Sequence, residues 1–179
     1  MTRRFRAIAA MSALLMTASL LAASPAAAGC GWPSCNPARL TGTSSQTISP
    51  SGVSGVIRVS FTSSDPYPGA ETSVTFNGTS YARWLGSTPF NATSVRLVDS
   101  WHADGLGVAV GYPGGIGIVG SGSDASWDDT DLNTWRVEHS FSGVKFHGLD
   151  IIGIRENIAG YFKFGVHSYL INAEDDCFI

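Results

Sequence analysis

Short runs of alternating apolar and polar residues recur along most of the chain from residue 55 onward. The alternation is clearest where Trp135, Val137, His139 and Phe141 are separated by Arg136, Glu138 and Ser140. A period of two places successive side chains on opposite faces of a β-strand. Similar runs predict strands at residues 56–61, 73–76, 80–85, 94–102, 108–112, 116–119, 135–141, 149–155 and 160–171.

Turn-forming residues separate these runs. Asn77-Gly78 lies between two of the predicted strands and is the strongest short-range signal for a two-residue hairpin turn. No window has an apolar period of 3.6 residues over helical length, although residues 129–135 allow one helical turn. All 21 glycines follow residue 28, which favours turns and strands. The pattern therefore predicts one all-β domain, an antiparallel sandwich or barrel-like fold, over residues 55–179.

Residues 1–28 have the three parts of an export signal. Basic residues at Arg3, Arg4 and Arg6 precede an apolar stretch, and Ala26-Ala27-Ala28 offers a small-residue cleavage site. No later segment reaches the roughly 18 apolar residues of a membrane span. We therefore expect a secreted, extracellular protein that is not held in a membrane.

The mature chain is acidic. Cleavage after residue 28 removes three arginines and changes the net charge from −3 to about −6. This charge argues against nucleic acid and anionic lipid surfaces as partners, because both attract clustered Lys and Arg.

Residues 29–54 are predicted to form an extended N-terminal arm. Pro33, Pro37 and Pro50 interrupt the segment, and residues 41–47 are polar and tolerate β structure. The segment has too little apolar content for a core of its own.

The three cysteines leave the pairing open. Cys30–Cys35 is the simplest disulfide in an oxidising compartment, with Cys177 then free, buried or joined to a partner protein. The alternative, Cys35–Cys177, ties the two ends of the domain together. It becomes attractive if Cys30 carries a lipid, because Ala-Ala-Gly before Cys30 faintly resembles a lipoprotein cleavage site.

Candidate metal ligands lie in an acidic segment. Asp129, Asp131 and Asn133 alternate as oxygen ligands of Ca²⁺ do, but the glycine and the distal glutamate of a calcium loop are absent. We therefore favour a solvated loop and expect neither a metal nor another cofactor.

No catalytic residue is predicted. A Gly-x-Ser-x-Gly nucleophile turn is missing, and the histidines lack the close spacing of zinc ligands. The acid pairs considered for a glycosidase have no separation fixed by the sequence. The histidines are His102, His139, His147 and His167, and the acid pairs are Asp99/Asp104 and Asp150/Glu156.

Tryptophans are candidates for a sugar-stacking platform or for core packing. They are Trp84, Trp101, Trp127 and Trp135. Trp127 lies in a polar segment and is expected to be the most exposed of them.

The Cys-Gly-Trp-Pro-Ser-Cys segment at Cys30–Cys35, followed by a compact β-domain, resembles the adaptor subunit of the umbrella toxin particles of actinobacteria. The resemblance implies a non-enzymatic bridge between a lectin subunit of trypsin-like fold and the repeat-containing shaft of a large toxin chain. It also implies that the N-terminal segment enters the cleft of the lectin subunit. Cys177 has no place in that pattern.

The sequence thus predicts a secreted adaptor that works in a hetero-oligomer and binds protein partners through its N-terminal arm. The partner-binding residues are expected to be Cys30, Gly31, Trp32, Pro33, Ser34 and Cys35. A disulfide ring there would preorganise Trp32, a residue type common at interface anchors. The alternatives are a secreted carbohydrate-binding module and a small extracellular hydrolase or enzyme inhibitor.

Overall fold

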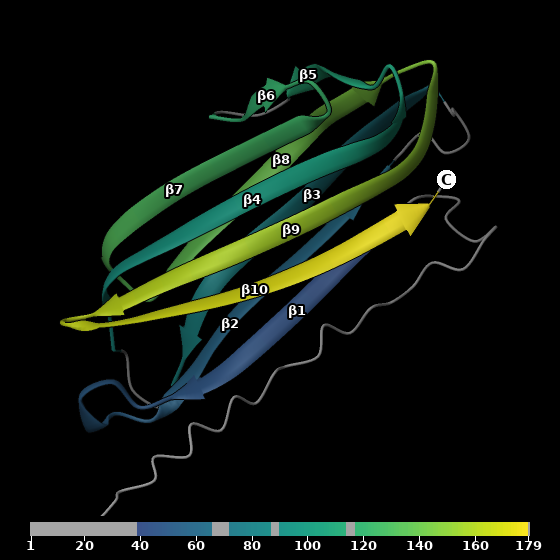
Figure 1. Cartoon of the computed structure of the whole chain (residues 1–179). Helices are drawn as coiled ribbons and strands as arrows, with labels where there is room; N and C mark the ends of the chain where they lie inside the picture. Colours follow the sequence, from purple (N-terminus) through teal and green to yellow (C-terminus); the bar gives the residue numbers. More distant parts are fainter. Residues whose placement is uncertain (1–38, 66–71, 87–89, 114–116, 179) are drawn as a thin grey trace, which may run out of the picture.

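A computed structural model of the chain describes residues 39–65, 72–86, 90–113 and 117–178. These residues form two antiparallel five-stranded sheets that face each other (Figure 1). The first sheet has the order β1 (Arg39–Ile48), β2 (Gly55–Ser64), β3 (Ser73–Leu85), β8 (Arg136–His147) and β5 (Ala109–Pro113). The second sheet has the order β10 (His167–Phe178), β9 (Asp150–Phe164), β4 (Ala92–Leu106), β7 (Asp124–Thr134) and β6 (Val119–Ser121). The all-β prediction is confirmed.

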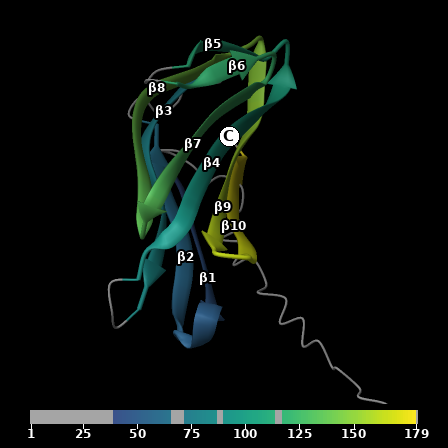
Figure 2. The ribbon, with the colours of Figure 1, turned by 90° about the vertical axis from the view of Figure 1, so that its left-hand side faces the viewer.

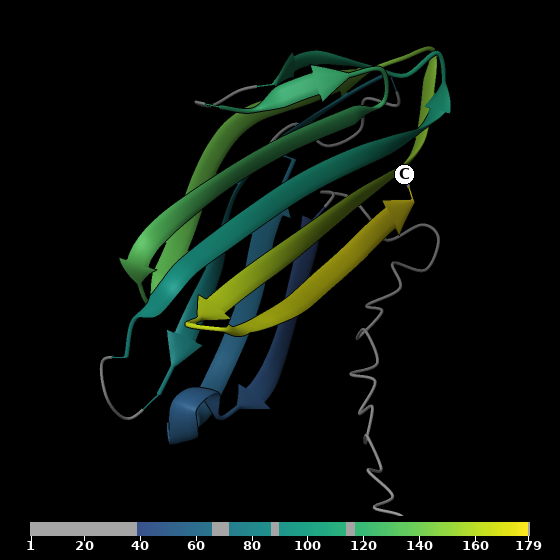
Figure 3. The same cartoon turned by 60° about the vertical axis from the view of Figure 1, so that its left-hand side comes forward.

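The two sheets form separate layers that approach each other at both edges (Figure 2). On one edge, β1 lies beside β10, and the Thr41 backbone N–H donates to the Asp175 carboxylate at 2.8 Å (Figure 3). On the other edge, the Val110 N–H of β5 donates to the Gly122 carbonyl, next to β6, at 2.7 Å. These contacts make the sandwich barrel-like.

Apolar side chains from alternate positions of both sheets fill the space between the layers. The largest fully buried side chains include Phe61, Phe76, Phe146, Trp101 and Phe162. Burying such side chains supplies the main driving force for folding. As predicted, β8 turns Val137, His139 and Phe141 inward.

The predicted hairpin turn at Asn77-Gly78 is wrong. Both residues lie inside the continuous strand β3, where the pairing with β8 shifts register between Phe76 and Gly78. A Cβ at Gly78 would lie 2.4 Å from the Thr62 carbonyl oxygen, so this crowded bulge requires glycine. Asn77 uses its side-chain oxygen to accept a hydrogen bond from the Gly143 N–H at 2.8 Å.

Other strand boundaries also differ from the predictions. Residues 149–155 and 160–164 belong largely to one strand, β9, and the chain reverses around Gly165, whose φ is 60°. Residues 129–134 continue strand β7 where a helical turn was allowed.

The prediction of an extended arm ahead of the β-domain over residues 29–54 is wrong for residues 39–54, which belong to the domain. β1 pairs with β2 along its whole length, from Arg39 opposite Ser64 to Ile48 opposite Gly55, and Leu40 is buried. An edge strand needs few apolar residues, because its backbone hydrogen bonds and its one inward face are enough to hold it. A short 3₁₀ turn, Pro50–Gly52, connects β1 to β2.

The predicted signal peptide, residues 1–28, and residues 29–38 of the predicted arm lie outside the described residues. Within the described ranges, no helix is long and apolar enough to cross a membrane.

Candidate functional site

A cluster of polar side chains lies inside the sandwich. Asp99 on β4 and Glu156 on β9 point inward, and both are 0% exposed. The Ser80 hydroxyl donates to Asp99 Oδ2 at 2.6 Å, and the Ser63 hydroxyl donates to Glu156 Oε2. His139 Nδ1 lies 3.4 Å from Asp99 Oδ2. We call these five residues the interior cluster.

Burial perturbs both carboxyl groups of the interior cluster. It raises the pKa of Asp99, although hydrogen bonds from His139 and Ser80 act in the opposite direction. It raises the pKa of Glu156 well above the usual range, and the charge of Asp99 raises this pKa further. Asp99 Oδ1 and Glu156 Oε1 are buried without a donor among the described residues. Burial beside Asp99 therefore favours the protonated form of Glu156, which avoids two adjacent charges.

Aromatic rings pack against the interior cluster. Trp127 stacks on the His139 ring with centroids 3.8 Å apart and planes within 1°. Trp101 packs against Phe141 in a T-shaped contact at 4.7 Å. Two carboxyls and a histidine are chemically suited to acid–base work, but such groups act only within hydrogen-bond reach of a substrate. With both carboxyls fully buried, no substrate reaches them in this structure.

The acid pairs considered for a glycosidase do not form. Asp99 and Asp104 lie five residues apart on β4 and so point to opposite faces, while Asp150 and Glu156 are six residues apart on β9, about 20 Å along a strand. The structure brings Asp99 close to Glu156 because β4 and β9 pair with Trp101 opposite Glu156. The inward positions of both acids within alternating runs were the available signal.

The calcium candidates stay at the surface. Asp129, Asp131 and Asn133 are exposed along β7, and Asp129 Oδ1 accepts a hydrogen bond from the Thr130 N–H at 2.8 Å. Within the described ranges, no group of three or more His, Cys, Asp and Glu residues is arranged to hold a metal ion.

The four histidines are not brought together. His102, on the outer face of β4, contacts Asp124 at 2.8 Å and Asp104 at 3.1 Å. The hydrogen bond to Asp124 is the main cause of its raised pKa. His139 belongs to the interior cluster, while His147 and His167 are exposed.

No tryptophan platform forms from the candidates. Trp84 and Trp101 are buried, and Trp127 is only 9% exposed. The prediction of an exposed Trp127 is therefore wrong, because the alternation of β7 turns Ala125 and Trp127 into the core. Trp135 is 39% exposed, and the Arg136 guanidinium lies 5.0 Å from its ring centroid.

Cys177 lies on β10 and is fully buried. Whether Cys30 pairs with Cys35 or Cys35 pairs with Cys177 stays a prediction. Cys30, Cys35 and the proposed binding residues between them lie outside the described residues, and their role stays a prediction.

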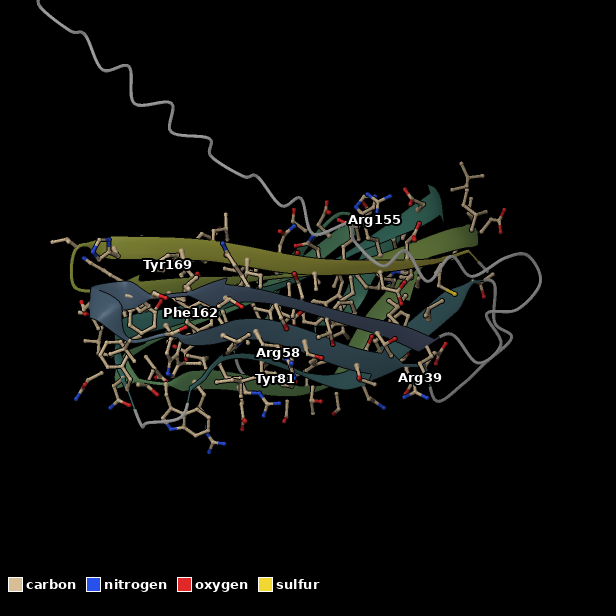
Figure 4. The ribbon with its side chains drawn as sticks, turned by 90° about the horizontal axis from the view of Figure 1, so that it is seen from below. Arg39, Arg58, Tyr81, Arg155, Phe162 and Tyr169 are labelled. Atoms are coloured by element: carbon tan, nitrogen blue, oxygen red, sulfur yellow. The ribbon has the colours of Figure 1, made fainter. Side chains whose placement is uncertain are left out.

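The two sheets differ strongly in charge. The strands of the first sheet carry five basic residues and one acidic residue: Arg39, Arg58, Arg83, Arg136, Lys145 and Glu138. The strands of the second sheet carry three basic and eleven acidic residues, of which Asp99, Glu156 and Asp175 are buried. Figure 4 shows Arg58 and Tyr81 on the side of β2 and β3, and Arg155 on the opposite side of the molecule.

The outer face of the second sheet is hollowed at two places. A pocket of about 360 Å³ is lined by residues that include Arg96, Tyr161, Lys163 and Leu170. Arg96 Nε donates to Asp128 at 3.0 Å, and the Arg96 guanidinium lies 5.5 Å from the Tyr161 ring centroid. A second pocket of about 220 Å³ includes Ser100, His102, Ser126, Arg155 and Asn157 in its lining.

Comparison with known proteins identifies no family. No protein-family model matches the chain, and no curated protein matches it. The case for a function therefore rests on the residues and surfaces described above.

Proposed function

We propose that the protein is a secreted, non-enzymatic adaptor that holds two other proteins together outside the cell. The partners implied by the resemblance to umbrella toxin adaptors are a lectin-like subunit and a large toxin chain. The observation that supports an adaptor is the opposite charge of the two sheets. A bridge needs two separate surfaces that distinguish their partners, and complementary charge provides that discrimination and speeds association.

The enclosure of the interior cluster supports a non-enzymatic role. Both of its carboxyls have a raised pKa, that of Glu156 well above the usual range, and perturbed acids are the usual first candidates for catalysis. The complete burial of the two carboxyl groups explains their raised pKa values without a catalytic role. The hydroxyls and the histidine that satisfy them come from the opposite sheet, so the contacts join the two layers.

Residues 29–38 remain the candidate segment for binding a partner. This segment is shorter than the arm of residues 29–54 that the sequence predicted. It precedes Arg39, the first residue of the edge strand β1. The bond of Thr41 to Asp175 places the start of β1 near the end of β10, where Cys177 lies. A disulfide from Cys177 to Cys30 or Cys35 would tie residues 29–38 to the end of the domain where β10 ends. Such a bond would reduce the ordering cost of binding.

Capture of partners from the native culture tests the adaptor. The tagged, secreted protein should co-purify with two different proteins, and chemical cross-linking should join it to each. A variant without residues 29–34 keeps Cys35 and should lose one partner while keeping the other. Recovery of no partner, or of a single partner from the intact protein, contradicts the adaptor.

Carbohydrate binding is a second candidate, supported by the pocket around Tyr161. Its volume of about 360 Å³ is adequate for a small ligand, and Tyr161 is an exposed ring on the pocket wall. Retention on a polysaccharide that is lost in Tyr161→Ala, with Tyr81→Ala as the control on the other sheet, would establish it. Equal retention of both variants would exclude this pocket.

A further inference from the structure

Three arginines lie directly opposite one another on the outer face of the first sheet. Arg58 on β2 faces Arg83 on β3, and Arg83 faces Arg136 on β8. We call these three residues the arginine row. Directly opposed residues of antiparallel strands have Cβ atoms about 5 Å apart, and like charges there destabilise a sheet. The arginine row is therefore unfavourable for the protein by itself.

The charges of the arginine row are only partly compensated. Arg58 Nε donates to the Ser45 hydroxyl at 2.9 Å, and Arg83 Nη2 donates to the Tyr81 hydroxyl at 3.1 Å. Among the described residues, neither arginine has a carboxylate within ion-pair distance, whereas Arg136 pairs with Glu138 at 3.2 Å. Each guanidinium has five N–H donors, so most donors of Arg58 and Arg83 remain available.

Arg83 is held in place rather than left to move freely. Its guanidinium lies 4.2 Å from the centroid of the Tyr81 ring, in a cation–π contact, and the same tyrosine accepts its hydrogen bond. Arg83 Nε is buried and has no hydrogen-bond partner among the described residues. A positioned arginine loses less freedom on binding than a mobile one.

The arginines of the second sheet contrast with this arrangement. Arg96 is paired with Asp128, and Arg155 lies 4.0 Å from Glu174. Both are thus next to a carboxylate on their own sheet. The arginine row is therefore the part of the described surface where uncompensated positive charge is concentrated, on a chain that is acidic overall.

We propose that the arginine row, with Tyr81 beside it, docks an acidic polypeptide segment of a partner protein. This inference rests on the proposed adaptor function and names the chemistry of one partner. Carboxylates match the guanidinium fork in bidentate geometry. A polypeptide is favoured over a sulfated glycan because Arg and Tyr are the residue types that dominate protein interfaces, and because the pockets at Tyr161 and Arg155 lie on the other sheet.

Binding to poly-L-glutamate at low salt tests this surface. The full secreted protein should bind, with affinity falling as salt rises, and Arg58→Gln/Arg83→Gln should weaken binding about 10-fold or more. Arg96→Gln/Arg155→Gln is the matched control, since it removes the same charge from the other sheet, and its affinity should stay within about 2-fold. Urea unfolding checks that both variants fold; the midpoint of Arg58→Gln/Arg83→Gln should not lie below that of the wild type, because the substitutions remove like charges that face each other. Arg58→Lys/Arg83→Lys should bind less well than the wild type, because lysine lacks the bidentate fork.

Equal weakening in both double variants would overturn the proposal, since overall charge would then account for binding. So would binding to heparin that depends on Arg58 and Arg83 when poly-L-glutamate is not bound, which would indicate a sulfated glycan. Capture from the native culture separates this inference from the adaptor itself. If Arg58→Gln/Arg83→Gln retains both partners, the docking surface is wrong and the adaptor stands. If the wild type captures no partner, the adaptor fails whatever poly-L-glutamate shows.

Discussion

The interior cluster should make the stability of the protein fall as pH rises, and Glu156→Gln tests this. Burial raises the folded-state pKa of Asp99 and Glu156 above their ordinary values of 3.8 and 4.5. Between those ordinary values and the raised ones, the folded protein binds more protons than the unfolded chain. The contribution of these two groups to the free energy of unfolding is therefore fully present below about pH 4. It is lost as the pH rises through the folded-state pKa values.

Glutamine at position 156 keeps the size of the side chain and removes its charge. Its amide can donate to Asp99 Oδ1, a buried acceptor without a donor among the described residues. Leaving such a group unsatisfied costs about 1–3 kcal/mol, and more when it is charged. We therefore expect Glu156→Gln to be about 1–3 kcal/mol more stable than the wild type at pH 8. Near pH 4, where the wild-type glutamic acid is protonated, the difference should vanish.

Urea unfolding followed by tryptophan fluorescence at pH 4, 6 and 8 measures the effect. With a slope of about 2 kcal/mol per molar urea, the variant's midpoint should lie roughly 0.5–1.5 M higher at pH 8. Glu174→Gln is the control, because Glu174 lies at the surface, bonded to Asn157, and should shift the midpoint little at any pH. A wild-type midpoint that does not fall between pH 4 and 8 would refute the reasoning. So would a gain for Glu156→Gln that is the same at pH 4 and pH 8.

Three further substitutions test the fold. Gly78→Ala should cost about 2 kcal/mol or more in urea unfolding, because the new methyl group meets the Thr62 backbone oxygen; Thr79→Ala, at an exposed neighbour, should cost far less. Trp127→Ala should lower stability by about 3–5 kcal/mol through loss of the buried ring on His139, without changing retention on a polysaccharide. If the alternative disulfide between Cys35 and Cys177 forms, Cys177→Ser should cost about 2–5 kcal/mol and release one titratable thiol; an unchanged thermal midpoint with no new thiol would contradict that disulfide.

The strands were predictable because their signal is local. Alternation at Val137, His139 and Phe141 fixed which side chains face the core, and the structure buries all three. The predicted turn at Asn77-Gly78 does not form. β3 pairs with β2 on one side and β8 on the other, and this pairing outweighs the local turn preference of two residues. β1 was missed for a related reason: a polar edge strand has a weak pattern by itself and is defined by its partner β2.

The sites depend on strand order, which the pattern does not contain. The sequence analysis did not place Asp99 or Glu156 in the core, where the structure buries both. Their proximity follows from the pairing of β4 with β9, two strands that are more than 40 residues apart in the chain. The arginine row likewise needs the order β2, β3, β8, in which the last strand is far from the other two in sequence.

The interior cluster fixes how the two charged sheets are oriented relative to each other. Every hydrogen bond that the hydroxyls and the histidine make to the two carboxyls runs from the first sheet to the second. Apolar packing alone tolerates small shifts of one sheet over the other, whereas buried hydrogen bonds fix a register because a shift leaves polar atoms unsatisfied. The proposed adaptor function would require the two partner surfaces to keep a constant orientation. The buried acids, costly for stability at neutral pH, fix how the basic face of the first sheet stands relative to the acidic face of the second.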